Sequence, residues 1–480
     1  MTDEPPGGVL SKVRRMVTGG GGSGGGTDAD RPGGDWDGDA DWMDEDWEEE
    51  YDWAGATIRA PEEVPFHETP QVLITNLKPT TEVTVRARMP LPDGIWSSWA
   101  TFQPDQMGRV DLSRMEPTDG TYEGVDASGL FWSMTREKRL DMTPDDPDEH
   151  VTSVVVELSV EMYGKTVGET TIERTFADDV ETKTVDEGDL VGEFHRPEAD
   201  GPHPGILFLG GSGGGVPGPQ FPMLLASQGY AVLSLAYFGT GDLPETLEMI
   251  PLEYFDEAIE WLAEESAVAD PPYGVVGISR GGELALELGS RVPELETVVG
   301  YVPSGVRFDG IPNFGPPDPA WTVDGEPLST VSTKFSLSFV RTLLWRWLTR
   351  NPIRISPTYA DGLAAADEEI VEAAEIPVEE IGGPVLLVSG DDDGLWPADD
   401  LAEIAVDRLD DHDYDAFYDH EHYEEAGHGI GLPNAPTTET VGGTFLPGLP
   451  MEFGGTASAN AEAAAEAWTA TLETLEEGLD

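Results

Sequence analysis

The sequence contains no cysteine among its 480 residues. Disulfide bonds, thiolate metal sites and a cysteine nucleophile are therefore excluded. No apolar run reaches the roughly 18 residues that a membrane-spanning helix requires, so we expect no membrane span. Arg14 and Arg15 precede a glycine-rich stretch and not an apolar one, which is unlike an export signal. We therefore expect a cytoplasmic location.

Positive charge is scarce: 26 Lys and Arg face 94 Asp and Glu, for a net charge of −68, and only six residues are lysines. Carboxylates repel one another in dilute buffer, whereas in molar salt the Debye length falls to about 3 Å and suppresses the repulsion. The spread of acid along the whole chain indicates adaptation to high salt, as in an extreme halophile. One acidic tail alone would explain only residues 28–52. The same charge argues against nucleic acids and anionic membranes as general partners.

Residues 1–57 form a low-complexity region that includes a glycine-rich linker at 18–27 and an acidic run at 35–53. The acidic run can bury little apolar surface, which predicts a disordered, solvated tail. It nevertheless contains regularly spaced tryptophans, which could instead dock on a partner or on the protein's own surface: Trp36, Trp42, Trp47 and Trp53.

Residues 58–176 consist of short strand-like runs, among them "SSWATFQ" and "GLFWSM", separated by turn formers such as Asp119-Gly120. Short strands at regular spacing predict an immunoglobulin-like β-sandwich. No combination of side chains in this region looks catalytic.

Residues 177–480 have a different pattern, in which apolar strand candidates alternate with amphipathic helical segments. This alternation predicts a mainly parallel sheet with helices on both faces, the α/β-hydrolase class. Residues 306–378 interrupt the alternation, and an insertion of that length indicates a functional cap. The strand candidates lie at 205–210, 231–237, 273–279, 297–303 and 384–390.

The segment "GISRG" places Gly277 and Gly281 two positions either side of Ser279. A sharp strand-to-helix turn holds a nucleophile in a strained conformation, and the crowded backbone around it requires small flanking residues. The spacing between a strand and a helix therefore predicts a nucleophile elbow at Ser279. The alternative is a glycine-rich turn with an ordinary serine.

A serine nucleophile requires an oriented base, and this fold supplies the acid and then the histidine downstream. Four histidines follow Ser279, and His428 lies in a glycine-bracketed loop after a strand candidate. Asp393 in "LLVSGDDDGLWP" is the best-placed acid, with Asp392 as the fallback. The other downstream histidines are His412, His420 and His422. The His420-x-His422 pair has no evident third ligand, so we expect no metal site there.

Backbone N–H groups must stabilise the oxyanion of such a reaction. We expect one donor at Arg280 and a second at Gly211 or Ser212, in the loop "GSGGG" after the first parallel strand. A phosphate-binding loop is the competing interpretation, but the G-K-[ST] ending that it requires is absent.

At these residues the chain resembles the acyl-CoA thioesterases related to bile acid-CoA:amino acid N-acyltransferase, over most of residues 60–470. The matching segments include "AYFGTGDLPETLEMIPLEYFDEAIEWL", "GVVGISRGGELAL", "VSGDDDGLWP" and "AGHGIGLP". The resemblance implies a nucleophile, acid and base at Ser279, Asp393 and His428. It also implies an acyl-CoA substrate and neither a metal nor a redox cofactor.

The resemblance leaves several functions open. Family members that transfer acyl groups to amino acids carry a cysteine nucleophile, so serine favours hydrolysis over N-acyltransfer. A carboxylesterase or dienelactone-type lactone hydrolase on the same fold is the other catalytic alternative. A non-catalytic binding protein that kept the fold is the last.

Coenzyme A is a polyanion, so this acidic protein needs a local basic site to bind it. The segment 341–354, "RTLLWRWLTRNPIR", contains four arginines and no acid. A helical spacing of i, i+4 places Arg346 and Arg350 on one face. The alternative is a structural helix paired with surface acids. If the segment binds substrate, the expected contacts are Arg341, Trp345, Arg346 and Arg350, with Trp347 also able to cover an acyl chain or an adenine.

The charge analysis predicts that the fold is lost at low ionic strength. Transfer from molar to millimolar salt should abolish the far-ultraviolet circular dichroism of the native state, because carboxylate repulsion is then no longer screened. A spectrum that stays unchanged across this range contradicts the prediction.

Overall fold

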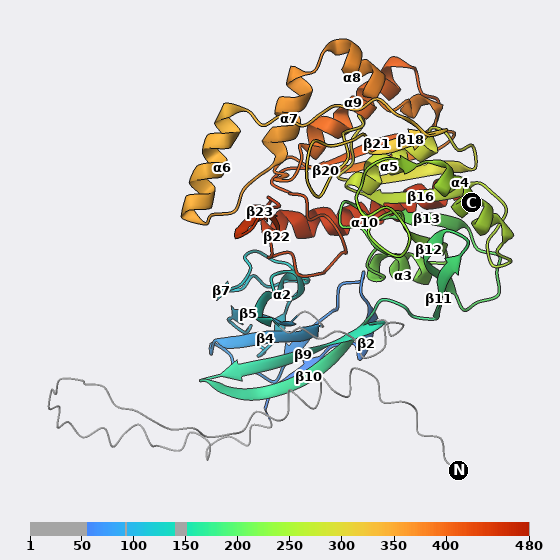
Figure 1. Ribbon diagram of the computed structural model, residues 1–480. Helices are drawn as coiled ribbons and strands as arrows, with labels where there is room; N and C mark the ends of the chain where they lie inside the picture. Colours follow the sequence, from blue (N-terminus) through green and yellow to red (C-terminus); the bar gives the residue numbers. More distant parts are fainter. Residues whose placement is uncertain (1–54, 92–93, 140–150, 480) are drawn as a thin grey trace, which may run out of the picture.

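The computed structural model describes residues 55–91, 94–139 and 151–479. The predicted tail therefore lies almost entirely outside the described residues. Figure 1 shows an N-terminal β region (blue to blue-green) beside a larger α/β region (green to red). Strand β10 ends at Thr175 in the first region, and β11 begins at Val180 in the second.

The N-terminal region is built on antiparallel strands whose side chains alternate between buried and half-buried positions, as along β5. The larger sheet has the order β2-β10-β9-β4-β5-β7, with β8 also paired to β5, and a smaller sheet has the order β1-β3-β6. The immunoglobulin-like character of this region stays a prediction. The strands are β1 (Thr57–Arg59), β2 (Glu63–Pro65), β3 (Leu73–Thr75), β4 (Val83–Leu91), β5 (Gly94–Phe102), β6 (Val110–Asp111), β7 (Asp119–Gly120), β8 (Thr135–Arg139), β9 (Ser153–Met162) and β10 (Lys165–Thr175).

The strand predicted at "GLFWSM" is wrong, because these residues form the short helix α2 (Gly129–Trp132). The Asp126 carboxylate accepts hydrogen bonds from the Ser128 amide (2.7 Å) and from the Trp132 indole (2.6 Å), which folds the chain back on itself. Every residue of α2 is buried. An apolar run without alternation does not distinguish a buried strand from a buried helix.

The second region contains an eight-stranded sheet of order β11-β12-β14-β13-β16-β17-β20-β21. Numbered within this sheet, the order is 1-2-4-3-5-6-7-8, with antiparallel pairing only among the first three neighbours. This is the α/β-hydrolase fold, so the predicted class is confirmed. The strands are β11 (Val180–Glu187), β12 (Leu190–Pro197), β13 (Gly205–Leu209), β14 (Ala231–Ala236), β16 (Tyr273–Ile278), β17 (Leu295–Tyr301), β20 (Val385–Gly390) and β21 (Tyr418–Tyr423).

Helices cover both faces of this sheet (Figure 1), and β13 and β14 are buried at every residue. Helices α3 and α10 share a core with the N-terminal region, whereas α4, α5 and most of α9 pack into a second core on the other face. The helices are α3 (Gln220–Ser227), α4 (Glu253–Glu264), α5 (Arg280–Gly289), α9 (Ala398–Asp411) and α10 (Ala457–Leu479).

The predicted insertion, residues 306–378, contains two short strands and most of the remaining helices. Helix α6 projects from the edge of the α/β region (Figure 1, upper left) and contacts the β22–β23 hairpin through Phe339 and Leu449. No helix within the described ranges is long and apolar enough to cross a membrane. The elements of the insertion are β18 (Trp321–Val323), β19 (Glu326–Pro327), α6 (Leu337–Thr349), α7 (Ser356–Ala365) and α8 (Glu368–Ala374), and the 3₁₀ helix η1 (Val378–Glu380) begins at its last residue. The remaining short strands lie outside the insertion: β15 (Ile250–Pro251), β22 (Val441–Leu446) and β23 (Leu449–Glu452).

Residues 430–440 connect the α/β region to the N-terminal region by hydrogen bonds. The Asn434 amide donates to the His67 carbonyl oxygen (2.9 Å), and the Thr437 N–H donates to the Trp132 carbonyl oxygen (3.0 Å). Arg136 and Glu439 add an ion pair across the same boundary. The loop that follows β21 is thus held by partners from both regions.

Candidate active site

Ser279 occupies the sharp turn between β16 and α5, with a left-handed backbone at φ 59° and ψ −119°. A Cβ atom at Gly277 would lie 2.0 Å from the Gly281 carbonyl oxygen, and one at Gly281 would lie 2.4 Å from the Gly210 carbonyl oxygen. Both positions therefore require glycine, as expected for an elbow of this kind. The turn raises the serine at the carboxyl ends of the central strands.

The structure brings Ser279, His428 and Asp393 together although 149 positions separate the serine from the histidine. His428 Nε2 lies 3.0 Å from Ser279 Oγ, and His428 Nδ1 lies 2.6 Å from Asp393 Oδ2. A carboxylate can only accept hydrogen bonds, so Nδ1–H donates to Asp393 and Nε2 is free to accept the serine proton. This is the hydrogen-bonded order of a serine hydrolase triad.

Backbone contacts orient the acid and the base. Asp393 Oδ1 accepts the N–H groups of Leu395 (2.7 Å) and Trp396 (3.3 Å), and its side chain is almost fully buried. The His428 N–H donates to the Phe453 carbonyl oxygen (2.9 Å). Since Gly394 donates to the same oxygen at 3.0 Å, a single carbonyl group links the loop of the acid to the loop of the base.

The alternative acid, Asp392, points elsewhere. Its side chain pairs with Arg354 and accepts the Gly455 N–H (2.9 Å), so it contributes to loop structure and does not contact the histidine. His420 lies 2.7 Å from Ser389 Oγ. His422 hydrogen-bonds to Asp399, and this contact raises the pKa of His422. Across the described ranges, no cluster of three His, Asp or Glu side chains is arranged to hold a metal ion.

The two predicted oxyanion positions have different surroundings. Gly211 lies against the nucleophile, because a Cβ built on it would be 3.6 Å from Ser279 Oγ. The Tyr237 hydroxyl donates to the neighbouring Gly210 carbonyl oxygen (2.6 Å) and fixes this loop. Arg280 follows the nucleophile as the first residue of α5. Ser212 is exposed in the next turn, so Gly211 is the better placed of the two candidates.

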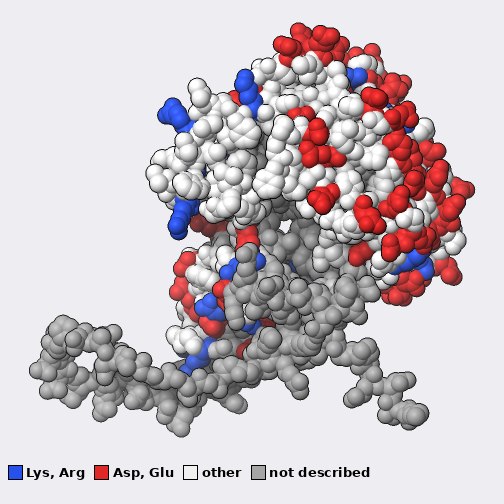
Figure 2. Space-filling view, viewed as in Figure 1, with Lys and Arg blue, Asp and Glu red and all other residues white. Residues whose placement is uncertain are grey.

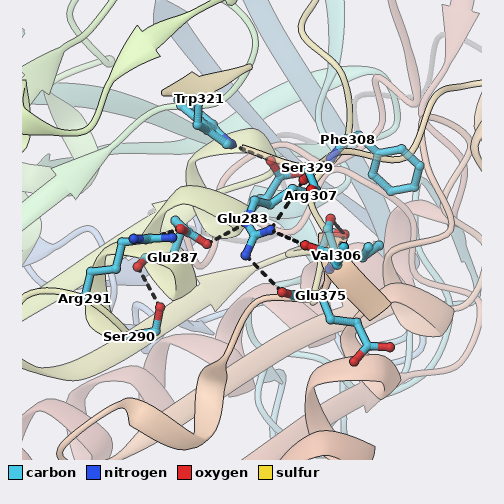
Figure 3. A network of polar contacts seen from close by, with 12 residues as sticks. Glu283, Glu287, Ser290, Arg291, Val306, Arg307, Phe308, Trp321, Ser329 and Glu375 are labelled. Atoms are coloured by element: carbon cyan, nitrogen blue, oxygen red, sulfur yellow. Dashed lines mark hydrogen bonds and ion pairs between the residues drawn. The ribbon is translucent and has the colours of Figure 1, made fainter. Parts of the chain in front are cut away.

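Figure 3 shows a buried polar network built on Glu283 and Glu287 of α5, the helix that follows Ser279. Glu283 accepts the Trp321 indole N–H at 2.7 Å and pairs with the Arg280 guanidinium at 3.0 Å. Burial raises the pKa of Glu283, although the charge of Arg280 opposes the shift. Arg280 Nη2 also donates to the Phe308 carbonyl oxygen (3.0 Å). The residue after the nucleophile is thereby tied to the inserted segment.

One turn further along α5, the fully buried Glu287 accepts Arg307 Nε at 2.8 Å and also pairs with Arg291. Arg307 extends the network to the Ala373 and Glu375 carbonyl oxygens at 3.1 and 3.0 Å. Sequence reasoning missed this network. Its signal was present, because two acids four positions apart interrupt the apolar face of an otherwise buried helix.

The arginine-rich segment only partly follows its prediction. Helix α6 ends at Thr349, and Arg350 is its left-handed C-cap, so the expected shared face of Arg346 and Arg350 is wrong. A C-cap residue leaves the helical spiral, which ends the i, i+4 relation. Arg354 pairs with Asp392 (2.7 Å) and Glu452 (3.1 Å), as the structural alternative had it.

A cavity of about 340 Å³ lies between α6 and α7. Two basic residues and one acidic residue line it, together with three residues that carry hydroxyl groups: Arg346, Arg354, Asp361, Ser336, Ser338 and Thr342. Arg354 also donates to the Asp392 carbonyl oxygen (2.6 Å), one residue before the candidate acid. The cavity is thus close in the fold to the triad. Arg341 and Trp345 lie outside it, exposed on α6.

The strand order and the Ser279–His428–Asp393 arrangement define a protein of the α/β-hydrolase class with a serine-type site. Models of the acyl-CoA thioester hydrolase/BAAT family match its N-terminal region at residues 67–187 and its C-terminal region at residues 250–315 and 351–480. The chain belongs to this family.

Individual relatives agree with this membership. Human mitochondrial acyl-coenzyme A thioesterase 2 is 30% identical over 84% of this chain and 80% of its own length. Mouse acyl-coenzyme A amino acid N-acyltransferase 1 is 28% identical over 86% of this chain and 94% of its own. Among solved structures, the Pyrococcus horikoshii acylaminoacyl peptidase aligns over 86% of this chain and 60% of its own at 12% identity. Its TM-score of 0.40 is too low to support the fold assignment, which rests on the strand order alone.

The α5 network predicts a large loss of stability when Glu287 is neutralised. Glu287→Gln leaves the buried Arg307 without its counter-charge, which should lower the free energy of unfolding by about 3–5 kcal/mol. Urea denaturation in molar salt measures the change. The control is Glu161→Gln, which breaks the half-exposed pair with Arg86 and should cost about 0–1 kcal/mol. Equal losses for the two variants contradict the assignment.

Proposed function

We propose that this protein hydrolyses acyl-CoA thioesters to a free acid and coenzyme A through an acyl-enzyme on Ser279. The observation that carries the proposal is the continuous hydrogen-bonded chain from Ser279 Oγ through His428 to the buried Asp393. Its presence in a member of the acyl-CoA thioester hydrolase/BAAT family supports the thioester as the bond that is cleaved.

In the first half-reaction Ser279 Oγ attacks the thioester carbonyl carbon while His428 Nε2 takes the hydroxyl proton. Asp393 accepts the Nδ1–H bond throughout and stabilises the imidazolium that forms. The developing oxyanion lies between the backbone of Gly211 and the N–H of Arg280, where positive dipoles lower the barrier. The carbon–sulfur bond then breaks and the coenzyme A thiolate leaves, taking a proton from the imidazolium.

In the second half-reaction His428 takes a proton from water, and the resulting hydroxide attacks the acyl carbon. The carbon–oxygen bond to Ser279 breaks, and His428 returns the proton to Oγ. Every proton is carried by residues of the chain, so the proposed reaction uses no cofactor. Coenzyme A enters only as part of the substrate.

Hydrolysis is favoured over transfer to an amino acid because the nucleophile is serine and the chain has no cysteine. The ester and lactone alternatives would use the same three side chains, so the triad alone does not distinguish the substrates. Residues that contact the coenzyme A part of the substrate are needed to favour the thioester. A cytoplasmic location and the immunoglobulin-like type of the N-terminal region also stay predictions.

We further propose that α6 binds the phosphates of coenzyme A. Arg346 is half-buried at the cavity, and Arg341 and Arg350 are exposed nearby on the same segment. Within the described ranges these three arginines have no carboxylate partner, which leaves their donors available to a phosphate. Trp345, whose ring lies 5.6 Å from the Arg346 guanidinium carbon, offers a surface for stacking.

Substitutions of Ser279 and of the neighbouring residues Asp392 and Asp393 test the catalytic assignment. Ser279→Ala should lower palmitoyl-CoA hydrolysis by roughly 10⁴-fold or more, and Asp393→Asn by about 10⁴-fold, because the base then lacks its nucleophile or its orientation. Asp392→Asn is the matched control and should keep most activity, since its side chain contacts only loop partners. Retained turnover in Ser279→Ala, or equal losses for Asp392 and Asp393, contradict the mechanism.

A substrate comparison tests the phosphate contacts. Arg346→Glu combined with Arg350→Glu should raise the KM for palmitoyl-CoA about tenfold, equal to about 1.4 kcal/mol, and leave p-nitrophenyl ester hydrolysis unchanged because that substrate lacks phosphates. The control pair Arg59→Glu with Arg109→Glu changes the net charge equally on the exposed N-terminal region. An unchanged KM for palmitoyl-CoA rules out this site.

A further inference from the structure

Helix α6 has two apolar faces although only one of them packs on the protein. Phe339 and Leu343 point inward to the β22–β23 hairpin. On the opposite side a second set of apolar residues follows the spacing i, i+3, i+7, i+10, i+11, which is one continuous helical face. These side chains are between 37% and 86% exposed: Leu337, Val340, Leu344, Trp347 and Leu348. A face of this kind requires an occupant.

The segment that contains α6 carries a net positive charge, which is unusual in this acidic chain. Residues 327–360 contain five Lys and Arg and no Asp or Glu, whereas the whole chain has 94 acids in 480 residues, about one in five. Figure 2 shows the contrast: blue side chains stand out from a white surface where α6 projects, and red covers the opposite side of the α/β region. The occupant of α6 should therefore be acidic as well as apolar.

The sequence supplies one segment with both properties. Residues 35–53 contain 11 Asp and Glu, no Lys or Arg, four tryptophans and one tyrosine. This segment and α6 both fall outside the ranges matched by the family models, which leave out residues 1–66, 188–249 and 316–350. Two unusual additions of opposite charge and shared aromatic character in one chain are explained together if they bind each other.

We propose that residues 35–53 dock on the outward face of α6 through Trp36, Trp42 and Trp47, with these tryptophans on its leucines and the neighbouring carboxylates on its arginines. The chain enters the described structure at Gly55, which lies beside Val167 near the tip of the β9–β10 hairpin. That tip and α6 lie on the same side of the molecule (Figure 1, left). Nineteen residues extend over up to roughly 60 Å, and α6 itself is only about 20 Å long, so a docked part of that length leaves up to about 40 Å of chain as a tether.

Physical conditions in high salt explain why the segment combines acid with tryptophan. At molar salt, attraction beyond about 3 Å is screened, so carboxylates alone would not hold the segment. Burial of indole rings against Leu344 and Leu348 is not weakened by salt, and arginine over an indole adds a cation–π contact. Covalent attachment within one chain also raises the effective concentration, to about the millimolar range for a short linker, so weak contacts suffice.

Other occupants fit the charges less well. A second copy of α6 would bring three arginines against three arginines, with like-charge repulsion at contact. An anionic membrane would attract α6 but repel the acidic surface that Figure 2 shows over the rest of the α/β region.

The docked segment would also occupy the arginines that we assign to coenzyme A, a consequence that rests on the proposed function. A polyanion of the same chain would then compete with the substrate phosphates and raise the KM for acyl-CoA. The docking itself does not depend on this competition.

The absence of cysteine permits a direct test by site-directed spin labelling of the full chain in molar salt. One labelled pair joins the segment to α6, through Ala40→Cys and Thr349→Cys. The control pair joins the segment to the exposed, acidic helix α8, through Ala40→Cys and Glu369→Cys. Pulsed electron paramagnetic resonance should give a short, narrow distance distribution for the α6 pair and a longer mean distance for the α8 pair.

Two sets of substitutions locate the contact. Leu344→Ser with Leu348→Ser on α6, or Trp42→Ser with Trp47→Ser in the segment, should remove the narrow component and leave the ester hydrolysis of the enzyme unchanged. Equally broad distributions for both pairs of the unsubstituted chain overturn the proposal. So does a narrow distance between two molecules labelled only at Thr349→Cys, which would assign α6 to a dimer. Vesicles of phosphatidylglycerol test the membrane alternative. If the label at Thr349→Cys enters these vesicles and the α6 pair gives no narrow distance distribution, the docking proposal is overturned in favour of a membrane.

Added coenzyme A separates the docking from the proposed function. Displacement of the narrow component by saturating coenzyme A supports a shared site, and the tryptophan substitutions should then lower the KM for palmitoyl-CoA several-fold. A narrow component that persists at saturation overturns the competition and leaves the docking supported.

Discussion

The close approach of three backbone segments around Ser279 is the constraint on which the site depends. The carbonyl oxygen of Gly210, at the end of β13, occupies the space that a side chain at Gly281 would need, and Gly277 meets the same limit from β16. This contact fixes the nucleophile at the sheet edge and holds Gly211 beside it. The parallel neighbours β20 and β21 then set where the loops of Asp393 and His428 begin, so both side chains reach the serine from a single edge of the sheet.

Much of this arrangement could be predicted because the sheet is buried on both faces. Uninterrupted apolar runs such as β13 and β20 have few other possible structures, and the glycine spacing at Ser279 has one steric explanation. The choice of Asp393 over Asp392 also follows from strand position, since the residue nearer the helix start can accept two amide N–H groups. Sequence periodicity gave a wrong prediction at α2, where every residue of a short run is buried. It also gave a wrong prediction at Arg350, where a left-handed C-cap ends the helix.

Carboxylates serve three distinct purposes in this chain. On the surface they are numerous and solvated, and they give the chain its net charge of −68. On α5, Glu283 and Glu287 are buried and paired, and they fasten the inserted segment to the helix that carries the nucleophile. Within residues 327–360, which include α6, they are missing. The surface carboxylates can be recognised from the composition. The buried pairs are visible only in the fold, because Arg307 lies 20 positions from its partner Glu287 in the sequence.

The bonds from residues 430–440 to the N-terminal region have a consequence for how the protein is divided. This loop begins just after His428, and its amide and hydroxyl groups are satisfied by His67, Trp132 and Met134. An isolated α/β half would lose these partners and release the chain next to its imidazole. The N-terminal β region is therefore better regarded as a brace for the loop that follows His428 than as a detachable module.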